Sequence, residues 1–185
     1  MITVGIDEVG RGCWAGPLVA GAVVLNNDIP GLADSKVLTK RSRELLATEI
    51  TAQAAAVGLG WVDAQTVDRV GLTEAVRMAM KQALQHITVP YDEIIIDGNL
   101  NFLPDEACAR AIIKADGSIP AVSAASIVAK VARDAYMSDI AQRYPEYGFD
   151  KHVGYGTAVH IAALRLHGVS DIHRRSYKPI KALLQ

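Results

Sequence analysis

The sequence lacks the features of a secreted or membrane-bound protein. Only two of its 185 residues are cysteines, and Cys13 and Cys108 lie far apart without the spacing of a metal site. Reduced thiols in a cytoplasmic protein are therefore the expected state. The longest clean apolar run, Leu18–Leu25, is too short to cross a bilayer. Two acids stand at positions 7 and 8, and no basic segment precedes an apolar stretch, which argues against a signal peptide.

An excess of either charge is also missing. Lys and Arg number 19 against 20 Asp and Glu, which leaves a net charge of -1. No overall positive field draws the protein onto nucleic acid, so any such binding has to come from local patches. The sequence has no internal repeat, no low-complexity segment and no linker long enough to separate two folded domains. Its 185 residues, 50% of them hydrophobic, suffice for one domain with a full core, which we expect over residues 1–185.

The most informative stretch is Ile2–Pro17, ITVGIDEVGRGCWAGP. Its alternating apolar residues predict a strand that reaches two adjacent carboxylates, Asp7 and Glu8. Neighbouring side chains on a strand point to opposite faces, so both acids can serve one site only if the strand ends or bends there. The glycines that follow make such a bend feasible. The alternative is a solvated strand end followed by a turn.

Two further apolar segments end in an acid followed by glycine. The segment Tyr91–Gly98 contains three consecutive isoleucines, typical of a strand covered on both faces, and closes with Asp97. Ala111–Ala115 predicts a short strand followed by Asp116. A lone Asp at a strand end is often only a turn residue. In open α/β sheets, however, ligands gather beyond the strand ends.

The remaining elements follow from apolar periodicity and from cap and turn residues. They are strands at 18–25 and 58–64, a helix capped by Thr39, a helical segment at 65–87 broken near Gly71, a long helix at 120–144 and a last helix from Thr157 to Gly168. The long helix is expected to bury one stripe of residues, namely Val122, Ala125, Ala129, Ala132, Tyr136 and Ile140.

Three polar groups each allow two interpretations. Ser123, Ser126 and Lys130 share one face near the start of the long helix, where free N–H groups favour phosphate, or they form a solvated helix start. Ser35 and Lys36 belong to a polar cluster that either contacts phosphate or is a plain loop. The basic tail either contacts a phosphate backbone or is solvated, and it comprises His173, Arg174, Arg175, Tyr177, Lys178 and Lys181.

The strand predictions place four acids at neighbouring strand ends: Asp7, Glu8, Asp97 and Asp116. Such a group repels itself and raises the pKa values of its members unless cations neutralise it. Oxygen ligands without His or Cys suit Mg²⁺ or Mn²⁺. Two such ions about 3.5–4 Å apart are a common device for displacement at phosphorus. Residue types alone therefore indicate a metal-dependent phosphoryl-transfer enzyme, with phosphate held by Arg11, Ser35, Lys36, Ser123, Ser126 and Lys130.

Eight motifs, in order along the chain, resemble ribonuclease HII, the type 2 ribonuclease H family. They are GIDEVGRG at 5–12, AGP at 15–17, DSK at 34–36, DG at 97–98, KAD at 114–116, SAASIVAKVARD at 123–134, GYGT at 154–157 and IHRRSY at 172–177. Any one motif is weak, whereas eight in order are specific. The GRG group and the lack of an N-terminal extension favour type 2 over the type 3 relatives.

The resemblance implies a ribonuclease H-like fold, a five-stranded mixed sheet flanked by helices, with a small helical C-terminal extension over 144–185 that helps hold substrate. It implies hydrolysis of the RNA strand of RNA–DNA hybrids and incision 5′ to single ribonucleotides in duplex DNA, leaving 3′-hydroxyl and 5′-phosphate ends. A cytoplasmic monomer using Mg²⁺ or Mn²⁺ is the expected form.

Site residues carry over by motif. Asp7, Glu8, Asp97 and Asp116 match the four metal-binding acids. Gly10, Arg11 and Gly12 match a loop that reads the ribose 2′-hydroxyl largely through backbone atoms, and Tyr155 matches a tyrosine that stacks at the RNA–DNA junction.

One departure from the family pattern concerns this loop. Cys13-Trp14 stands where Pro and an aliphatic residue are more usual, which places the geometry of the loop in question. Two other functions stay open. A catalytically inactive hybrid-binding module would need some other defect, since all four acids are present, and the Tyr155 and GRG matches speak against a related nuclease acting on branched DNA.

Overall fold

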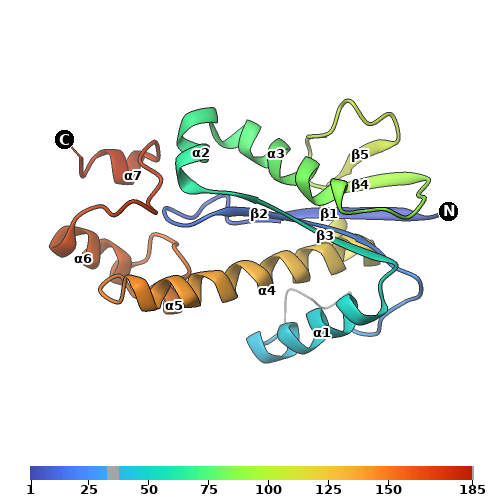
Figure 1. The fold of residues 1–185 in the computed structure, drawn as a ribbon, viewed down its shortest axis with the longest axis horizontal. Helices are drawn as coiled ribbons and strands as arrows, with labels where there is room; N and C mark the ends of the chain where they lie inside the picture. Colours follow the sequence, from blue (N-terminus) through green and yellow to red (C-terminus); the bar gives the residue numbers. More distant parts are fainter. Residues whose placement is uncertain (33–37, 185) are drawn as a thin grey trace.

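Five strands form one mixed sheet with helices on both faces (Figure 1). The structure, a computed structural model, describes residues 1–32 and 38–184. The strands are β1 Thr3–Val9, β2 Leu18–Val24, β3 Ala56–Val62, β4 Glu93–Asp97 and β5 Ala109–Ile112. Across the sheet their order is β3-β2-β1-β4-β5. The pairs β1–β2 and β2–β3 are antiparallel, whereas β1–β4 and β4–β5 are parallel. The predicted five-stranded mixed sheet is confirmed.

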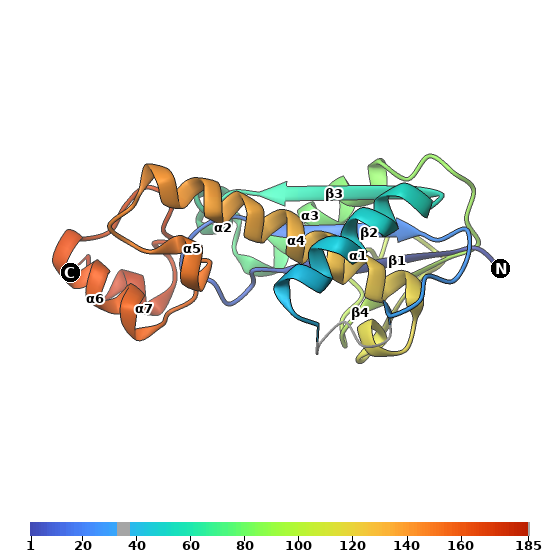
Figure 2. The same ribbon diagram turned by 90° about the horizontal axis from the view of Figure 1, so that it is seen from below.

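The helices lie in two layers and a terminal group. They are α1 Lys40–Gln53, α2 Ala64–Val70, α3 Leu72–Gln85, the 3₁₀ turn η2 Ala115–Gly117, α4 Pro120–Arg143, α5 Phe149–His152, α6 Ala158–His167 and α7 Lys178–Lys181. α1 and α4 lie on one side of the sheet and α2 and α3 on the other (Figures 1 and 2). α5, α6 and α7 gather at the end of the molecule away from the N-terminus.

Local signals set most helix boundaries as expected. The side chain of Thr39 caps α1 by accepting from Ser42 N–H, and Thr157 caps α6 in the same way. Gly71, with φ +83°, separates α2 from α3 at the predicted break. The prediction of a strand through residue 64 is wrong, because Asp63 caps α2 and ends the extended chain at Val62.

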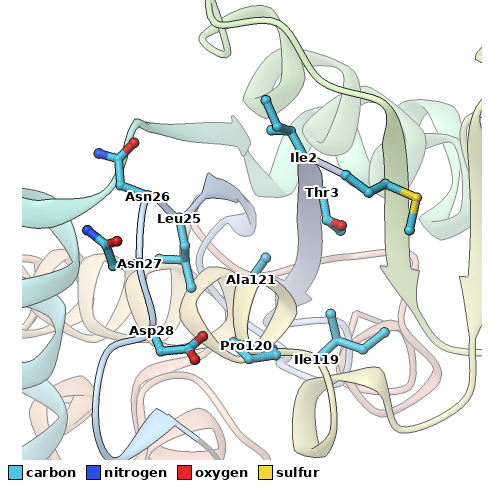
Figure 3. A pocket seen from close by; sticks show the side chains of 10 residues that line it. Ile2, Thr3, Leu25, Asn26, Asn27, Asp28, Ile119, Pro120 and Ala121 are labelled. Carbon is cyan, nitrogen blue, oxygen red and sulfur yellow. The ribbon is translucent and has the colours of Figure 1, made fainter.

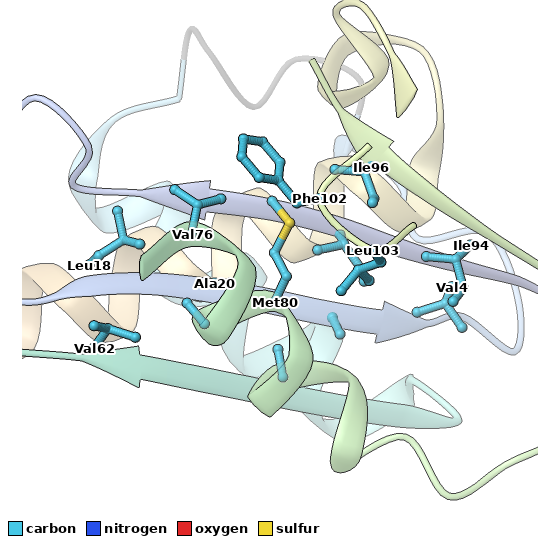
Figure 4. Close-up of a cluster of buried hydrophobic side chains, with 14 of the residues drawn as sticks. Val4, Leu18, Ala20, Val62, Val76, Met80, Ile94, Ile96, Phe102 and Leu103 are labelled. Carbon is cyan, nitrogen blue, oxygen red and sulfur yellow. The ribbon is translucent and has the colours of Figure 1, made fainter. Parts of the chain in front are cut away.

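Two apolar cores lie on the two faces of the sheet. Between the sheet and α3 the side chains of Val4, Ile94, Met80 and Leu103 are fully buried (Figure 4). On the other face, α1 and α4 cover a second core that includes Val23, Ile50, Ala124 and Ile127. A third cluster, formed by residues such as Met137 and Phe149, joins the end of α4 to the C-terminal segment.

The predicted buried stripe of α4 is correct at four of its six positions. Val122, Ala125, Ala129 and Ile140 are buried, but Ala132 is half-buried and Tyr136 is 39% exposed. Arg133 and Met137 are fully buried in their place. The reason is that the last turns of α4 are covered by the C-terminal segment, which packs on a different face of the helix from the sheet.

The basic tail is solvated only in part, since Arg175, Lys178 and Lys181 are exposed. Arg174 is fully buried and His173 nearly so, whereas Arg175 is exposed. The prediction that Arg174 contacts a phosphate backbone is wrong, because its guanidinium donates to backbone carbonyls inside the protein. Within the described part of the chain, no helix combines the length and apolar character needed to span a membrane.

Candidate active site

The acids meet because β4 ends beside β1. The parallel pairing of the two strands runs to Ile6 opposite Ile96, so Asp7 and Asp97 follow side by side. An end or bend of the strand at Asp7 was the condition for both acids to serve one site. β1 instead continues to Val9 while still paired with β2. The chain leaves β4 after Asp97, which opens the edge of β1 at Glu8. Burial raises the pKa of both Asp7 and Glu8, and the charge of Asp97 adds to the rise.

Asp116 reaches this edge from a turn instead of from a strand end. β5 stops at Ile112, earlier than predicted, and Asp116 lies in the 3₁₀ turn η2 that follows. Lys114, with φ 58°, reverses the chain before that turn. The backbone N–H of Asp116 then lies 3.4 Å from Oδ1 of Asp97, which joins the two motifs.

The start of α4 contacts both Asp7 on β1 and the turn η2 that carries Asp116. Gly5 allows the helix to lie directly on β1, since a Cβ there would come within 2.1 Å of the carbonyl carbon of Ala121. The hydroxyl of Ser126 on α4 forms a hydrogen bond with Asp7. Ser123 is buried, and its hydroxyl donates to the backbone carbonyl of Asp116. The predicted substrate contact of Ser123 is therefore wrong: in the structure its hydroxyl secures η2.

Burial dominates the electrostatics of the adjacent acids. Asp7 is only 8% exposed, and its burial raises its pKa to about 7, a shift that the Ser126 hydrogen bond opposes and the charges of Glu8 and Asp97 increase. Burial likewise raises the pKa of Glu8, against the effect of Arg11. The Arg11 guanidinium donates to Glu8 Oε1 at 3.0 Å. Glu8 Oε2 is buried and has no hydrogen-bond partner among the described residues.

This donor set fits a hard divalent cation. The side chains offer only carboxylate oxygen, and Oε2 of Glu8 is buried without a partner in the part of the chain that the structure describes. Among residues 1–32 and 38–184, no three His, Cys, Asp or Glu side chains are grouped so that they could hold a metal ion on their own. Mg²⁺ does not require three protein ligands, because it usually keeps several waters and takes one or two carboxylates together with substrate phosphates.

The predicted substrate loop follows β1 directly. Gly10 has φ +92°, and a Cβ there would lie 2.5 Å from Nε of Arg133, so only glycine fits. Arg11 is half-exposed, and its guanidinium lies over the ring of Phe102 at 5.8 Å while it binds Glu8. At Gly12 a Cβ would meet only the ring of Tyr155, at 3.8 Å. The loop and Tyr155 therefore border the same space.

The unusual Trp14 is accommodated behind Tyr155. Its indole occupies the place where a side chain at position 156 would point, since a Cβ on Gly156 would come within 2.1 Å of it. The N–H of Trp14 donates to the carbonyl of Gly154 at 2.8 Å. Tyr155 itself stays 42% exposed. The bulk of Trp14 thus supports the loop that carries Tyr155, and it does not displace that loop.

Other predicted contacts lie elsewhere. Ser35 and Lys36 fall outside the described residues. Lys130 pairs with Asp134 at 2.8 Å along α4, and its contact with phosphate stays a prediction. Sequence reasoning missed the burial of Arg133 and Arg174, although both stand in quoted motifs.

A separate hollow lies at the opposite end of β1. Its volume is about 540 Å³, and Asp28 is the only acid among the described residues that line it (Figure 3). The other residues that line it are Met1, Ile2, Thr3, Leu25, Asn26, Asn27, Ile119, Pro120 and Ala121. Since it shares no residue with the acidic group, it is not part of the candidate site.

Comparison with known proteins agrees with the motifs. The family model described as Ribonuclease HII matches residues 4–180. Ribonuclease HII of Bacillus cereus (strain B4264) is 46% identical over 183 residues, which cover 98% of this chain and 70% of that protein. The crystal structure of the ribonuclease H2 from Pyrococcus horikoshii OT3 matches with a TM-score of 0.84 at 28% identity, covering 99% of this chain and 97% of that one.

A more distant structure shares the fold alone. Bst-RNase HIII in complex with Mn²⁺ matches with a TM-score of 0.76 at 20% identity, over 100% of this chain and 69% of that one.

Proposed function

Because the chain belongs to the ribonuclease HII family, and so is a metal-dependent endoribonuclease acting on RNA–DNA hybrids, we propose that it also incises duplex DNA on the 5′ side of single embedded ribonucleotides. The proposed products carry 3′-hydroxyl and 5′-phosphate ends. The proposed catalytic and metal-binding residues are Asp7, Glu8, Asp97 and Asp116.

The observation that carries this proposal is the gathering of carboxylates where β1 runs past the end of β4. Asp97 acts electrostatically on both Asp7 and Glu8 although these two alternate along a strand. Burying like charges together without compensation destabilises a fold. Such a group is expected to persist where it binds cations.

Two divalent ions held there would supply an activated water and would stabilise the leaving oxygen. The protein's own part is to bind and orient: the Ser126 hydroxyl holds Asp7, and Arg11 turns Oε1 of Glu8 aside while Oε2 stays unpartnered within the described residues. Mg²⁺ and Mn²⁺ both suit these ligands, and Bst-RNase HIII has been seen with Mn²⁺.

Substrate selection is proposed for the loop Gly10–Arg11–Gly12 and for Tyr155, which border one space beside the acids. Ser126, Ser35 and Lys36 are proposed to contact phosphate. We further propose a monomer in the cytoplasm, because one chain supplies all four acids and both cysteines are free thiols.

The test is a nicking assay on duplex DNA with one ribonucleotide. The protein is incubated with Mg²⁺ or with Mn²⁺, and the ends are mapped on a sequencing gel. We expect one nick, 5′ to the ribonucleotide, that a chelator abolishes and added metal restores. Two controls are an all-DNA duplex and a branched all-DNA substrate. Cleavage of the branched DNA, or uncut ribonucleotide duplex beside cut RNA–DNA hybrid, would overturn the proposal.

A further inference from the structure

Two arginines are buried without a carboxylate partner. Arg133 and Arg174 have no exposed surface, and neither forms an ion pair with any described residue. Burying a cation is costly unless its N–H groups are satisfied. Both guanidinium groups donate to backbone carbonyls instead, and these carbonyls belong mainly to residues 10–17. The two cations therefore stabilise the path of one loop.

Arg174 binds the substrate loop at consecutive peptides. Its Nη1 lies 2.7 Å from the carbonyl oxygen of Gly10 and 3.1 Å from that of Arg11. Its Nε and Nη2 both donate to Gly16 O, at 3.2 and 3.0 Å. The hydroxyl of Tyr177 accepts from Arg174 and donates to Arg11 O at 2.5 Å.

These bonds determine where the next two N–H groups point. In a planar trans peptide the C=O of one residue is directed opposite to the N–H of the following residue. Since the carbonyls of Gly10 and Arg11 both face Arg174, the N–H groups of Arg11 and Gly12 both face away from it. No described residue accepts a hydrogen bond from either N–H. The loop thus presents two adjacent donors on the side away from Arg174, and a Cβ on Gly12 would lie 3.8 Å from the ring of Tyr155.

We infer that Arg174 and Tyr177 are positioning residues that hold the N–H groups of Arg11 and Gly12 outward as a paired donor for a ribose hydroxyl of the substrate. This inference rests on the proposed function. The 2′-hydroxyl is the group by which a protein tells RNA from DNA at one position. A fixed pair of neutral donors recognises an oxygen acceptor without adding affinity for every phosphate, as an exposed cation does.

Arg133, the other buried arginine, ties the segment that carries Tyr155 to the substrate loop. Arg133 donates to Ala15 O at 3.1 Å and to Val153 O at 2.9 Å, and so links the loop to the segment before Tyr155. Val153 adopts φ 44°, which is unfavourable for a β-branched residue and is held in part by this bond. The donor pair and Tyr155 are therefore positioned by one buried framework.

The mild variant Tyr177→Phe tests the inference, because it removes one hydroxyl and keeps the ring beside Arg174. Affinity is measured by fluorescence anisotropy for two duplexes that differ only in one ribonucleotide, in chelator so that no strand is cut. The matched control is Tyr147→Phe, which also removes a tyrosine hydroxyl bonded to a backbone carbonyl, that of Gly168.

We expect Tyr177→Phe to lower the ratio of ribonucleotide to all-DNA affinity by about 3- to 10-fold, the usual effect of one hydrogen bond. Affinity for the all-DNA duplex stays unchanged, and Tyr147→Phe keeps the wild-type ratio. Arg174→Lys, if it folds, lowers the ratio further, because an ammonium group does not span three carbonyls.

Two outcomes overturn the inference. If Tyr177→Phe leaves the ratio of ribonucleotide to all-DNA affinity unchanged, Tyr177 has no positioning role. If the variant loses affinity equally for both duplexes, Tyr177 contributes only to general stability. A wild-type protein that nicks the ribonucleotide duplex yet binds both duplexes equally would sink the inference alone. A wild-type protein that does not nick that duplex at all would sink the proposed function and the inference with it.

Discussion

At the scale of single residues, Asp7 combines a requirement for function with a cost in stability. It is buried beside Glu8 and Asp97, and its pKa is raised to about 7 chiefly by that burial. A neutral residue of the same shape would avoid both the desolvation and the repulsion. The carboxylate is therefore best explained by cation binding, and activity and stability should respond in opposite directions when its charge is removed.

Asp7→Asn is expected to reduce cleavage of an RNA–DNA hybrid by about 10³-fold or more, because the change removes a ligand charge and keeps the size of the side chain. The free energy of unfolding should stay the same or rise by on the order of 1 kcal/mol. Steady-state cleavage and urea denaturation without added metal measure the two effects.

The matched control for Asp7→Asn is Asp105→Asn, which neutralises an exposed acid paired with Lys81. We expect it to leave cleavage unchanged. Near wild-type cleavage by Asp7→Asn would remove Asp7 from the metal site, and a large loss of stability would mean that its charge supports the fold.

At the scale of elements, the closest contact behind the site is that of β1 with α4 at Gly5. A Cβ there would meet the backbone of Ala121 and Val122 at 2.1 and 2.2 Å. No rotamer change relieves a clash with backbone, so the helix itself would have to move. Because Ser126 on that helix holds Asp7, a change in sheet–helix spacing is transmitted to the acids.

Gly5→Ala is accordingly expected to lower the free energy of unfolding by about 3 kcal/mol and, in the protein that still folds, to lower kcat about tenfold. Thermal denaturation and steady-state kinetics are the measurements. Gly117→Ala is the stability control, since a Cβ there meets nothing within 4 Å. Equal stability of the two variants would show that α4 adjusts freely on β1.

A second element-scale device is a chain of buried histidines under Tyr155. Nδ1 of His160 lies 2.9 Å from the carbonyl of Tyr155, which only accepts, so Nδ1 carries the proton. Nε2 of His160 must then accept from Nε2 of His173, 2.9 Å away. Nδ1 of His173 in turn accepts from the N–H of Ser170. One neutral tautomer satisfies the whole chain, and an added proton breaks it.

Stability is therefore expected to fall with acidification. Burial lowers the pKa of both His160 and His173 from 6.5 to about 4, so between these values the unfolded chain binds more protons than the folded one. The contribution is fully present above pH 6.5 and is lost as the pH falls toward about 4. Urea denaturation across this window should show a loss on the order of 3 kcal/mol from this source.

The variant that checks this assignment is His160→Gln, which cannot titrate. It should be less stable than wild type at neutral pH but show a flatter dependence on pH between 6.5 and about 4. His86→Gln, at an exposed histidine, is the control and should keep the wild-type slope. An unchanged slope in His160→Gln would mean that other groups cause the acid sensitivity.

The elements that the sequence predicted well depend on local signals. Helix boundaries are set by residues that contact only the adjacent helical turn, such as Thr39, Gly71 and Thr157. The strand that ends at Asp97 is marked by a continuous apolar run. Asp116 was predicted to follow a strand and lies instead in a 3₁₀ turn. The reason is that Lys114 adopts a left-handed backbone conformation, which is uncommon for lysine and cannot be predicted from the residue type.

The buried arginines were beyond reach of the sequence for a different reason. Arg133 donates to Pro17 O, 116 positions away, and Arg174 to Gly10 O, 164 positions away. Carbonyls are present at every residue and leave no trace in composition or spacing. From the sequence alone, a basic residue is therefore predicted to be exposed.

At the scale of the whole molecule, the C-terminal segment is joined to the sheet by the loop that carries the substrate contacts. Arg174 N–H donates to Trp14 O at 2.7 Å, and Ala15 forms a β-bridge with His173. Asp68 on α2 accepts from the backbone of Arg175 and Ser176. These bonds connect residues 144–185 to both the loop and a helix on the sheet, which favours one cooperative unit.

The two tryptophans allow that cooperativity to be measured. Trp14 packs on Gly156 and lies 5.9 Å from the ring of His160, whereas Trp61 lies on β3 beside Tyr136. In Trp61→Phe the fluorescence reports the C-terminal junction, and in Trp14→Phe it reports the sheet. We expect each variant's fluorescence transition in urea to coincide with its own circular dichroism transition, because opening the junction alone would leave the cations of Arg133 and Arg174 without their carbonyls. A fluorescence midpoint in Trp61→Phe well below the circular dichroism midpoint would show that residues 144–185 detach first, and the substrate loop would then be ordered only when that segment is docked.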